Sequence, residues 1–358
     1  MPLGPQSTAE AGRAARRTTA TLQATRVVRK QTLDSREKLL NEFGNWLWSE
    51  RGVRLSSLLE KKPPDAEELC TFLVAYGQEM FSAGRSYGRY AETINSIAAA
   101  RPLIKKQLTA AWDLAFCWLS DEPHQHHPAM PRSVLLAASS LALMWGWPYV
   151  ASVLCIGWSG IMRIGEVMVA KRSDLVLPCD TAPGFQSILV KIRNPKTRGR
   201  SAKHQSARID PSDLVRLISA VYKDFDAEQA LWPYSPSTLR KRFAALMKVL
   251  ELDVARSSDQ APFDLGSLRP GGATDLLFET EDSELVRRRG RWLSARVMEI
   301  YLQEVLSSTF VSRLPRRVQL RIEQLANVFP EVLEKAISFL LSGIPPIVWY
   351  RLFQAQST

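Results

Sequence analysis

The chain has few cysteines, and they do not occur in pairs. Its 358 residues include four of them, Cys70, Cys117, Cys155 and Cys179, and none belongs to a Cys-x-x-Cys string. That scarcity and spacing exclude a disulfide framework and a standard zinc site. We therefore predict four small core residues in a protein of a reducing compartment.

Acidic residues are also in deficit. Lys and Arg number 47 against 36 Asp and Glu, so the formal net charge is +11. Such an excess is expected of a protein that follows the phosphates of a nucleic acid. Charge alone fits a basic enzyme of another class equally well, so the partner has to be inferred from motifs. The length is sufficient for two domains with their own cores.

Charged residues are absent altogether between Arg132 and Arg163. The stretch is long enough to span a bilayer. It contains five serines, however, and is interrupted at Gly146-Trp147-Pro148. A proline inside a helix removes a hydrogen bond and clashes with the preceding turn. We therefore predict two buried helices that meet at Trp147-Pro148, and no membrane partner.

Residues 1–33 contain one acid, Glu10, among many Arg, Thr and Ala residues. This composition predicts a disordered basic arm that contacts DNA, and it also fits an organellar transit peptide. The two alternatives place the protein in different compartments.

Apolar residues recur at helical spacing within residues 39–47, 69–80, 87–97 and 104–119. Four amphipathic helices predict a small helical domain over residues 34–122. The proline-rich segment 123–132 then predicts a linker. Its His124, His126 and His127 match no standard ligand spacing, so no metal site is expected there.

A second domain is predicted over residues 133–310. Residues 187–193 and 206–209 read as two strands of a hairpin around a basic turn, and helices follow at 211–222 and 236–250. The fold class is therefore mainly α with a small antiparallel β-sheet (α+β). The turn and the second helix carry the basic residues that we predict to contact DNA phosphates or base edges, namely Arg198, Lys203, Arg240, Lys241, Arg242 and Lys248.

Five further residues of this domain suggest a chemistry. They are Arg163 in MRIGE, Lys196 in RNPKT, Arg269 in SLRPGGATDLL, and Trp292 and Tyr301 in GRWLSARVMEIY. Two guanidinium groups, an ammonium and an indole N–H can hold a phosphodiester and the negative charge that substitution adds to it. A phenol can attack phosphorus and hold the phosphate covalently. Together they predict metal-free breakage and rejoining of DNA.

This set resembles the tyrosine recombinase (phage integrase) family. Arg163 to Glu166 is similar to the family's Arg-Ile-x-Glu string, and SLRPGGAT is similar to the string around its second arginine. Trp292 stands nine residues before Tyr301, as the family's His or Trp stands before its nucleophile. SLRPGGAT and GRW also look like recombinases of crypton- and DIRS-type mobile elements. The resemblance covers residues 131–309.

The resemblance implies a role for each residue. Arg163 and Arg269 would bind the non-bridging oxygens, and Glu166 would orient Arg163. Trp292 would donate a further hydrogen bond, and we call these phosphate-binding donors the cradle. Tyr301 would attack to form a 3′-phosphotyrosine. Lys196 would protonate the departing 5′ oxygen, with Lys191 or Lys203 as alternatives for that role.

The resemblance also implies partners and domains. The substrate would be double-stranded DNA, bound by a tetramer, and no cofactor would be needed because the phosphotyrosine conserves the bond energy. Residues 34–122 would be a core-binding domain that clamps the duplex, and residues 133–310 the catalytic domain. A eukaryotic protein of this kind is expected in the nucleus, and a bacterial one in the cytoplasm.

One position departs from the family. Three residues before the second arginine the family has His, and this chain has Gly266. The sequence leaves two hypotheses open: an active recombinase, or a domesticated, impaired one that binds DNA without cutting it. It also leaves open whether the C-terminal extension, residues 311–358, docks into a neighbouring protomer or covers its own catalytic domain.

Overall fold

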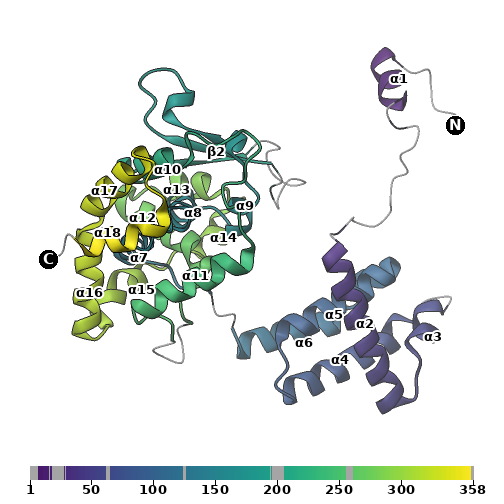
Figure 1. Cartoon of the computed structure of the whole chain (residues 1–358). Coiled ribbons are helices and arrows are strands. Elements are labelled where there is room, and N and C mark those ends of the chain that lie inside the picture. Colours follow the sequence, from purple (N-terminus) through teal and green to yellow (C-terminus); the bar gives the residue numbers. More distant parts are fainter. Residues whose placement is uncertain are drawn as a thin grey trace. The chain divides into compact units, whose positions relative to one another are not determined.

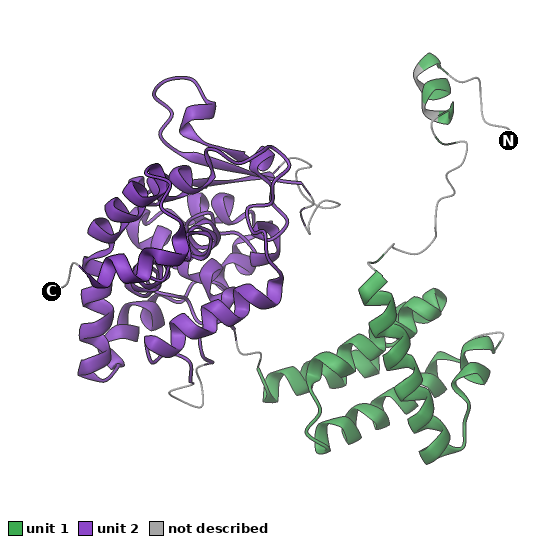
Figure 2. Ribbon diagram, viewed as in Figure 1, with its two compact units in different colours: residues 1–124 green, residues 125–358 purple. Residues whose placement is uncertain are grey.

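The chain divides into two compact units, Met1–His124 and Gln125–Thr358 (Figure 2). The computed structural model describes residues 7–15, 17, 28, 30–61, 65–123, 126–193, 195, 205–254 and 261–355. The division falls within the segment 123–132 that the sequence indicates as a linker.

The first unit is helical (Figure 1). Its elements are α1 (Thr8–Ala15), α2 (Lys30–Arg51), α3 (Leu55–Glu60), α4 (Ala66–Ser82), α5 (Tyr87–Ala100), η1 (Pro102–Gln107) and α6 (Thr109–Asp121). Helices α2, α4, α5 and α6 correspond to the four amphipathic stretches of the sequence, except that the fourth stretch begins in η1 and is helical in α form only from Thr109. Their apolar faces form one core, which includes Phe43, Leu73, Tyr90, Ile94 and Trp118.

Part of the N-terminal arm is helical, so its expected disorder is wrong for residues 8–15. The start of α1 is stabilised by a reciprocal pair of hydrogen bonds. Ser7 N donates to Glu10 Oε2 over 2.7 Å, and Glu10 N donates to Ser7 Oγ over 3.4 Å. Such a pair satisfies N–H groups that a helix start otherwise leaves free. Helix α2 also begins earlier than Asp34, at Lys30.

The second unit is mainly α with a small sheet, which confirms the predicted fold class. Its helices are α7 (Arg132–Met144), α8 (Pro148–Ser159), α9 (Ile164–Val167), α10 (Ser212–Tyr222), α11 (Pro236–Val249), α12 (Leu268–Thr280), α13 (Ser283–Gly290), α14 (Ala295–Glu299), α15 (Glu304–Phe310), α16 (Arg316–Asn327), α17 (Phe329–Leu341) and α18 (Trp349–Gln354). Short 3₁₀ turns are η2 (Arg172–Asp174), η3 (Pro178–Asp180), η4 (Leu265–Ser267), η5 (Val311–Arg313) and η6 (Pro346–Val348).

The sheet contains the predicted hairpin and one strand more. β2 (Ile188–Ile192) lies between β1 (Leu175–Val176) and β3 (Gln205–Ile209), and both pairings are antiparallel. Val190 stands opposite Leu175 on one side and Ala207 on the other, and all three are buried. Strand β1 has two residues, which is too short to show a period of two.

Helices α7 and α8 form the centre of the second unit. They are separated where the sequence predicts, because Gly146 adopts a φ of +70° and Pro148 is the first residue of α8. Helices α10, α12, α16 and α17 pack around them. Within the described ranges, no helix is both long and apolar enough to cross a membrane.

The end of the predicted linker belongs to the second unit, so the boundary at residue 132 is wrong. Ala129 and Met130 are buried. Met130 N donates to Ser267 O over 3.2 Å, and Met130 O accepts from Trp158 Nε1 over 3.0 Å. Prolines suggest a loop, but they do not show that this loop is packed.

The C-terminal extension covers the unit of its own chain. Helices α16 and α17 pack against α7, and Ser140 Oγ donates to Leu325 O over 2.8 Å. Phe329 and Trp349 are buried in the same core as α7 and α8. Of the two alternatives that the sequence leaves open, the structure therefore shows the intramolecular one.

The cysteines are only partly in the core. All four are free; Cys70 and Cys155 are buried, whereas Cys117 and Cys179 are exposed. The prediction is wrong for the latter two. Cys117 lies away from the buried face of α6, which carries Ala111, Ala115 and Trp118.

Candidate active site

Arg163 is fixed by Glu166 at the start of a short helix. Glu166 Oε2 accepts from Arg163 N over 3.1 Å, and Glu166 Oε1 accepts from Arg163 Nη1 over 3.0 Å. A spacing of three residues would place the two on one face of a helix. Arg163 instead has extended backbone and precedes α9, so the carboxylate both caps the helix and orients the guanidinium.

Arg269 is the second residue of α12, and it is 4% exposed. Its Nη2 donates to Gly290 O over 2.5 Å. The guanidinium carbon lies 4.9 Å from the ring centroid of Trp292 and 5.4 Å from that of Tyr301. The buried ring of Trp292, the half-buried ring of Tyr301 and one carbonyl therefore hold the guanidinium in place.

The Pro-Gly-Gly string after Arg269 allows α12 to approach α8 closely. A Cβ at Gly272 would lie 1.8 Å from Trp158 O, and one at Gly271 would lie 2.4 Å from Met130 O. Real side chains cannot occupy such positions, so glycine is required where these backbones meet. This close contact between the two backbones sets the distance of the start of α12, which carries Arg269, from α8.

In the sequence, Trp292 precedes α14 and Tyr301 follows it. The ring centroids are 5.0 Å apart, and Trp292 is 5% exposed, whereas Tyr301 is half-buried. Thr274 Oγ1 donates to Tyr301 O over 3.4 Å and ties the segment to α12. The structure therefore brings Arg163, Arg269, Trp292 and Tyr301 into one region around α9, α12 and α14.

Arg291 also belongs to this region, although it is not among the site residues that the motifs predict. Its Nη2 donates to Glu166 Oε2 over 2.9 Å and to Ile161 O over 3.3 Å. Arg291 is part of the GRW string, but the string does not show that the side chain turns towards Glu166. It does so from a left-handed backbone conformation, with φ of +59°.

Ile161 has the same unusual backbone conformation, with φ of +47°, two residues before Arg163. A β-branched residue strongly disfavours this region, and such outliers persist only where the surroundings impose them. Ile161 therefore marks strained backbone next to Arg163, and its carbonyl accepts from Arg291 Nη2.

Positive charge is concentrated around Glu166. Glu166 is paired with Arg163 and Arg291, and the guanidinium of Arg269 is near enough for its pKa to respond to all three charges. Burial lowers the pKa of Arg269, and the charges of Arg163 and Arg291 lower it further. Burial also lowers the pKa of Arg291, although Glu166 opposes that change. An anion bound here would relieve the repulsion among the three cations.

Several buried N–H donors of the site have no acceptor. Within the described chain, eight buried side-chain polar atoms lack a hydrogen-bond partner, and four of them lie here. They are Arg269 Nε, Arg269 Nη1, Arg291 Nε and Trp292 Nε1. Because buried donors are nearly always paired, this concentration indicates a site whose acceptor comes from a ligand.

The predicted DNA-contacting residues divide into three groups. Lys196, Arg198 and Lys203 lie outside the described residues. On α11, the side chains of Arg240, Lys241 and Lys248 are exposed and remain candidates for DNA contact.

Arg242 differs from these three because it is held within its own chain. Its guanidinium lies over the rings of Trp147, Trp232 and Tyr234, at 5.2, 6.0 and 4.9 Å from their centroids. These cation–π contacts restrict its reach towards a partner.

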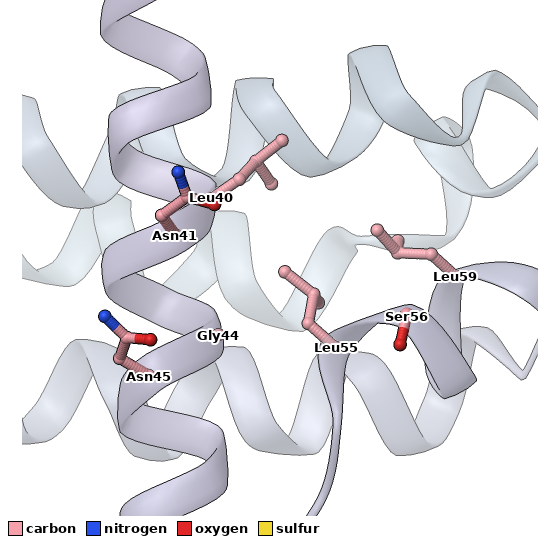
Figure 3. A pocket seen from close by; sticks show the side chains of 7 residues that line it. All are labelled: Leu40, Asn41, Gly44, Asn45, Leu55, Ser56 and Leu59. Atoms are coloured by element: carbon pink, nitrogen blue, oxygen red, sulfur yellow. The ribbon is translucent and has the colours of Figure 1, made fainter.

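Two other features of the described residues do not resemble a catalytic site. No group of three His, Cys, Asp or Glu side chains that could hold a metal ion occurs among them. A hollow of about 610 Å³ lies in the first unit, between α2 and α3 (Figure 3). Its lining includes Leu40, Asn41 and Leu55 and no charged side chain, so it has no cation to balance the charge of a phosphate.

Solved structures of a transposon integrase have a similar fold. The Tn1549 transposon integrase in complex with transposon right end DNA matches with a TM-score of 0.53 and 15% identity, over 88% of this chain and 98% of that one. The same integrase in complex with circular intermediate DNA matches with a TM-score of 0.52 and 15% identity, over 82% and 93%. No protein-family model matches this sequence, and neither does any curated protein.

The chain therefore has the fold of the tyrosine recombinases, as the sequence motifs indicate. At 15% identity the similarity establishes the fold and not the reaction. The roles of the individual residues have to be argued from their geometry.

Proposed function

We propose that the protein breaks and rejoins DNA strands through a phosphotyrosine intermediate. The observation that carries this proposal is the set of four buried N–H donors without acceptors on Arg269, Arg291 and Trp292, the first and last of which contact the Tyr301 ring. A scissile phosphate offers the anionic oxygens that such donors would bind. The partner is double-stranded DNA, and the Tn1549 integrase structures, which are DNA complexes of the same fold, support that choice.

The reaction begins with the phosphate in the cradle. Arg163 and Arg269 donate to its non-bridging oxygens, and Trp292 Nε1 donates to one of them. These donors are already fixed by Glu166, by Gly290 O and by burial, so little reorganisation is needed as charge develops.

Tyr301 then attacks phosphorus. Its oxygen forms a bond to phosphorus as the phenolic proton leaves, and the bond from phosphorus to the 5′ oxygen breaks. We assign Lys196 as the acid that protonates the 5′ oxygen; this residue lies outside the described part of the chain. Rejoining is the reverse, with the 5′ hydroxyl attacking the phosphotyrosine. Exchange of strands between two duplexes would need four protomers, so a tetramer on DNA is part of the proposal.

The test is incubation with supercoiled plasmid in EDTA. Relaxation and an SDS-stable protein–DNA adduct are expected for the wild type, and both should disappear in Tyr301→Phe. That substitution keeps the ring that contacts Trp292 and Arg269. Tyr350→Phe is the matched control, because Tyr350 is exposed on α18 and should be dispensable.

Each outcome separates the alternatives. Loss of the adduct in Tyr350→Phe, with Tyr301→Phe active, would show that the nucleophile is misassigned. A wild type that binds plasmid and short duplexes but never forms an adduct would establish the binding-only hypothesis that Gly266 raises.

A further inference from the structure

A histidine from the predicted linker occupies the space beside Gly266. A Cβ built on Gly266 would lie 2.8 Å from each of three ring atoms of His127, namely Cγ, Cδ2 and Nε2. That separation is too short for a real Cβ, so the imidazole fills the volume into which a side chain at position 266 would extend. Glycine at this position is what allows the ring to lie there.

Asp264 orients this imidazole. His127 Nδ1 lies 3.0 Å from Asp264 Oδ1, and the same oxygen accepts from Gly266 N over 2.7 Å and from Ser267 N over 3.2 Å. A carboxylate only accepts hydrogen bonds, so the imidazole proton is on Nδ1. In the neutral ring, Nε2 then has a free lone pair and can accept a proton.

The backbone of His127 is tied to the segment that carries Tyr301. Gln303, two residues after Tyr301, donates from Nε2 to His127 O over 2.9 Å and accepts at Oε1 from Ala129 N over 2.9 Å. Gln303 N donates to Thr274 Oγ1 over 3.2 Å, and that hydroxyl donates to Tyr301 O. Residues 127–130 are thus hydrogen-bonded both to the Tyr301 segment and, through Met130 and Ser267, to the Gly266 turn.

The side chain of His127 is 61% exposed, so it is open to a bound duplex and to the phenol that acts on it. The proposed reaction needs a group that removes the phenolic proton, and none of the cationic groups of the cradle has a free lone pair. Arginine, indole N–H and protonated lysine are donors only. His127 Nε2 is an acceptor on a ring that lies against Gly266, three residues before Arg269 of the cradle.

We propose that His127 is the catalytic base for Tyr301, oriented by Asp264; this inference rests on the proposed function. As the bond between Tyr301 and phosphorus forms, the phenolic proton moves to Nε2, and the resulting imidazolium is paired with the Asp264 carboxylate. In the rejoining step, Nε2 returns that proton to the tyrosine oxygen as the bond from phosphorus to that oxygen breaks. The imidazole thus comes from a residue more than a hundred positions away in the chain from Gly266.

The test is the single-turnover rate of adduct formation on plasmid. His127→Ala should lower it about 100-fold, the usual contribution of a general base. His126→Ala, at the exposed neighbouring position, should not change it. Added imidazole should restore much of the rate in His127→Ala and none in Tyr301→Phe. The double variant His127→Ala, Gly266→His should also regain activity, since it returns the imidazole to the vacated space.

A structural role for His127 is distinguished by His127→Asn. The Asn amide can donate to Asp264 as Nδ1 does, but it has no basic nitrogen. A wild-type rate in His127→Asn or in His127→Ala would overturn the inference and leave the proposed function intact. Absence of an adduct in the wild type would overturn the proposed function and, with it, the inference.

The orientation of the ring has a readout that does not require cleavage. The chain has four histidines, so ring ¹⁵N spectra are simple to assign by substitution. One histidine is expected to carry its proton on Nδ1, and its signal should vanish in His127→Ala. A His127 signal with the proton on Nε2 would contradict the proposed role of Asp264.

Discussion

Two buried tryptophans of the second unit differ in whether the indole N–H has an acceptor in the protein. Trp158 is 3% exposed, and its Nε1 donates to Met130 O over 3.0 Å. Trp292 is 5% exposed, and its Nε1 has no acceptor within the described chain. The two indoles are equally buried, so burial does not explain the difference. What differs is whether the protein or a ligand provides the acceptor.

The same contrast extends to the regions around the two indoles. In the α7–α8 core, Ser140 and Tyr222 donate to main-chain carbonyls, at 2.8 and 3.1 Å, and the Ser152 hydroxyl on α8 is a lone buried group without a partner in the described chain. Around Tyr301, four N–H donors remain unpaired. Each unpaired buried donor lowers stability by about 1–3 kcal/mol. The comparison teaches that stability has been given up where a phosphate would bind.

The largest effect is expected for Arg269→Lys. Lysine keeps the charge but loses the planar fork that contacts two oxygens at once, so adduct formation should fall about 10²- to 10³-fold. Arg321→Lys is the matched control, because Arg321 Nη1 donates to Val249 O and to Glu251 Oε1 within its own chain. It should lower the melting temperature and leave adduct formation unchanged. Equal adduct yields in the two variants would remove the distinction between paired and unpaired arginines.

The next effect compares the two indoles directly. Trp158→Phe leaves Met130 O without its donor, so it should lower the free energy of unfolding by about 1–3 kcal/mol more than Trp292→Phe does. Trp292→Phe should instead lower adduct formation about 10- to 100-fold, since it removes one donor from the cradle. Urea unfolding and the plasmid assay measure the two quantities. The reverse ranking in either assay would show that the Trp292 N–H is not reserved for a ligand.

The smallest effect concerns Asp275, a buried carboxyl on α12. Burial raises its pKa to about 6, although Arg132, 3.6 Å away, opposes the change. The folded protein therefore holds a proton between about pH 4 and 6 that the unfolded chain has lost, so stability falls as pH rises through about 6. A shift of about two units, in a side chain one-fifth exposed, corresponds to on the order of 2 kcal/mol.

Asp275→Asn should remove this loss, so its gain in stability over the wild type is expected to be larger at pH 7.5 than at pH 4.5. Urea unfolding at the two values measures it. Asp224→Asn, at an exposed carboxyl, should show no such change with pH. A gain for Asp275→Asn that is the same at both pH values would show that the carboxyl is charged throughout.

Much of the fold is visible in the sequence because local patterns record it. The apolar period locates α2, α4, α5 and α6, and Pro148 with Gly146 locates the break between α7 and α8. The helix at residues 8–15 was missed because its Ser7–Glu10 cap is a short signal. The exposure of Cys117 and the packing of Met130 depend on contacts between distant segments, which no local period records.

The candidate site divides in the same way. The strings around Arg163, Arg269, Trp292 and Tyr301 indicate a common site, and the structure brings these residues together. Arg291 and His127 were not predicted as site residues. Their side chains contact Glu166 and Gly266 because distant segments fold together, and no spacing within a motif records that. Gly266 looked like a missing group in the sequence. In the structure, the absence of a side chain at Gly266 leaves the space that the His127 imidazole occupies.

The packing of α16 and α17 against α7 has a consequence for the synthesis of the chain. Some 170 residues separate α7 from these helices, so at ordinary rates of translation α7 waits roughly 10–35 s for its covering. During that time its apolar surface is open to other chains and to chaperones. The centre of the second unit is thus made early and completed late, and the yield of folded protein depends on that interval.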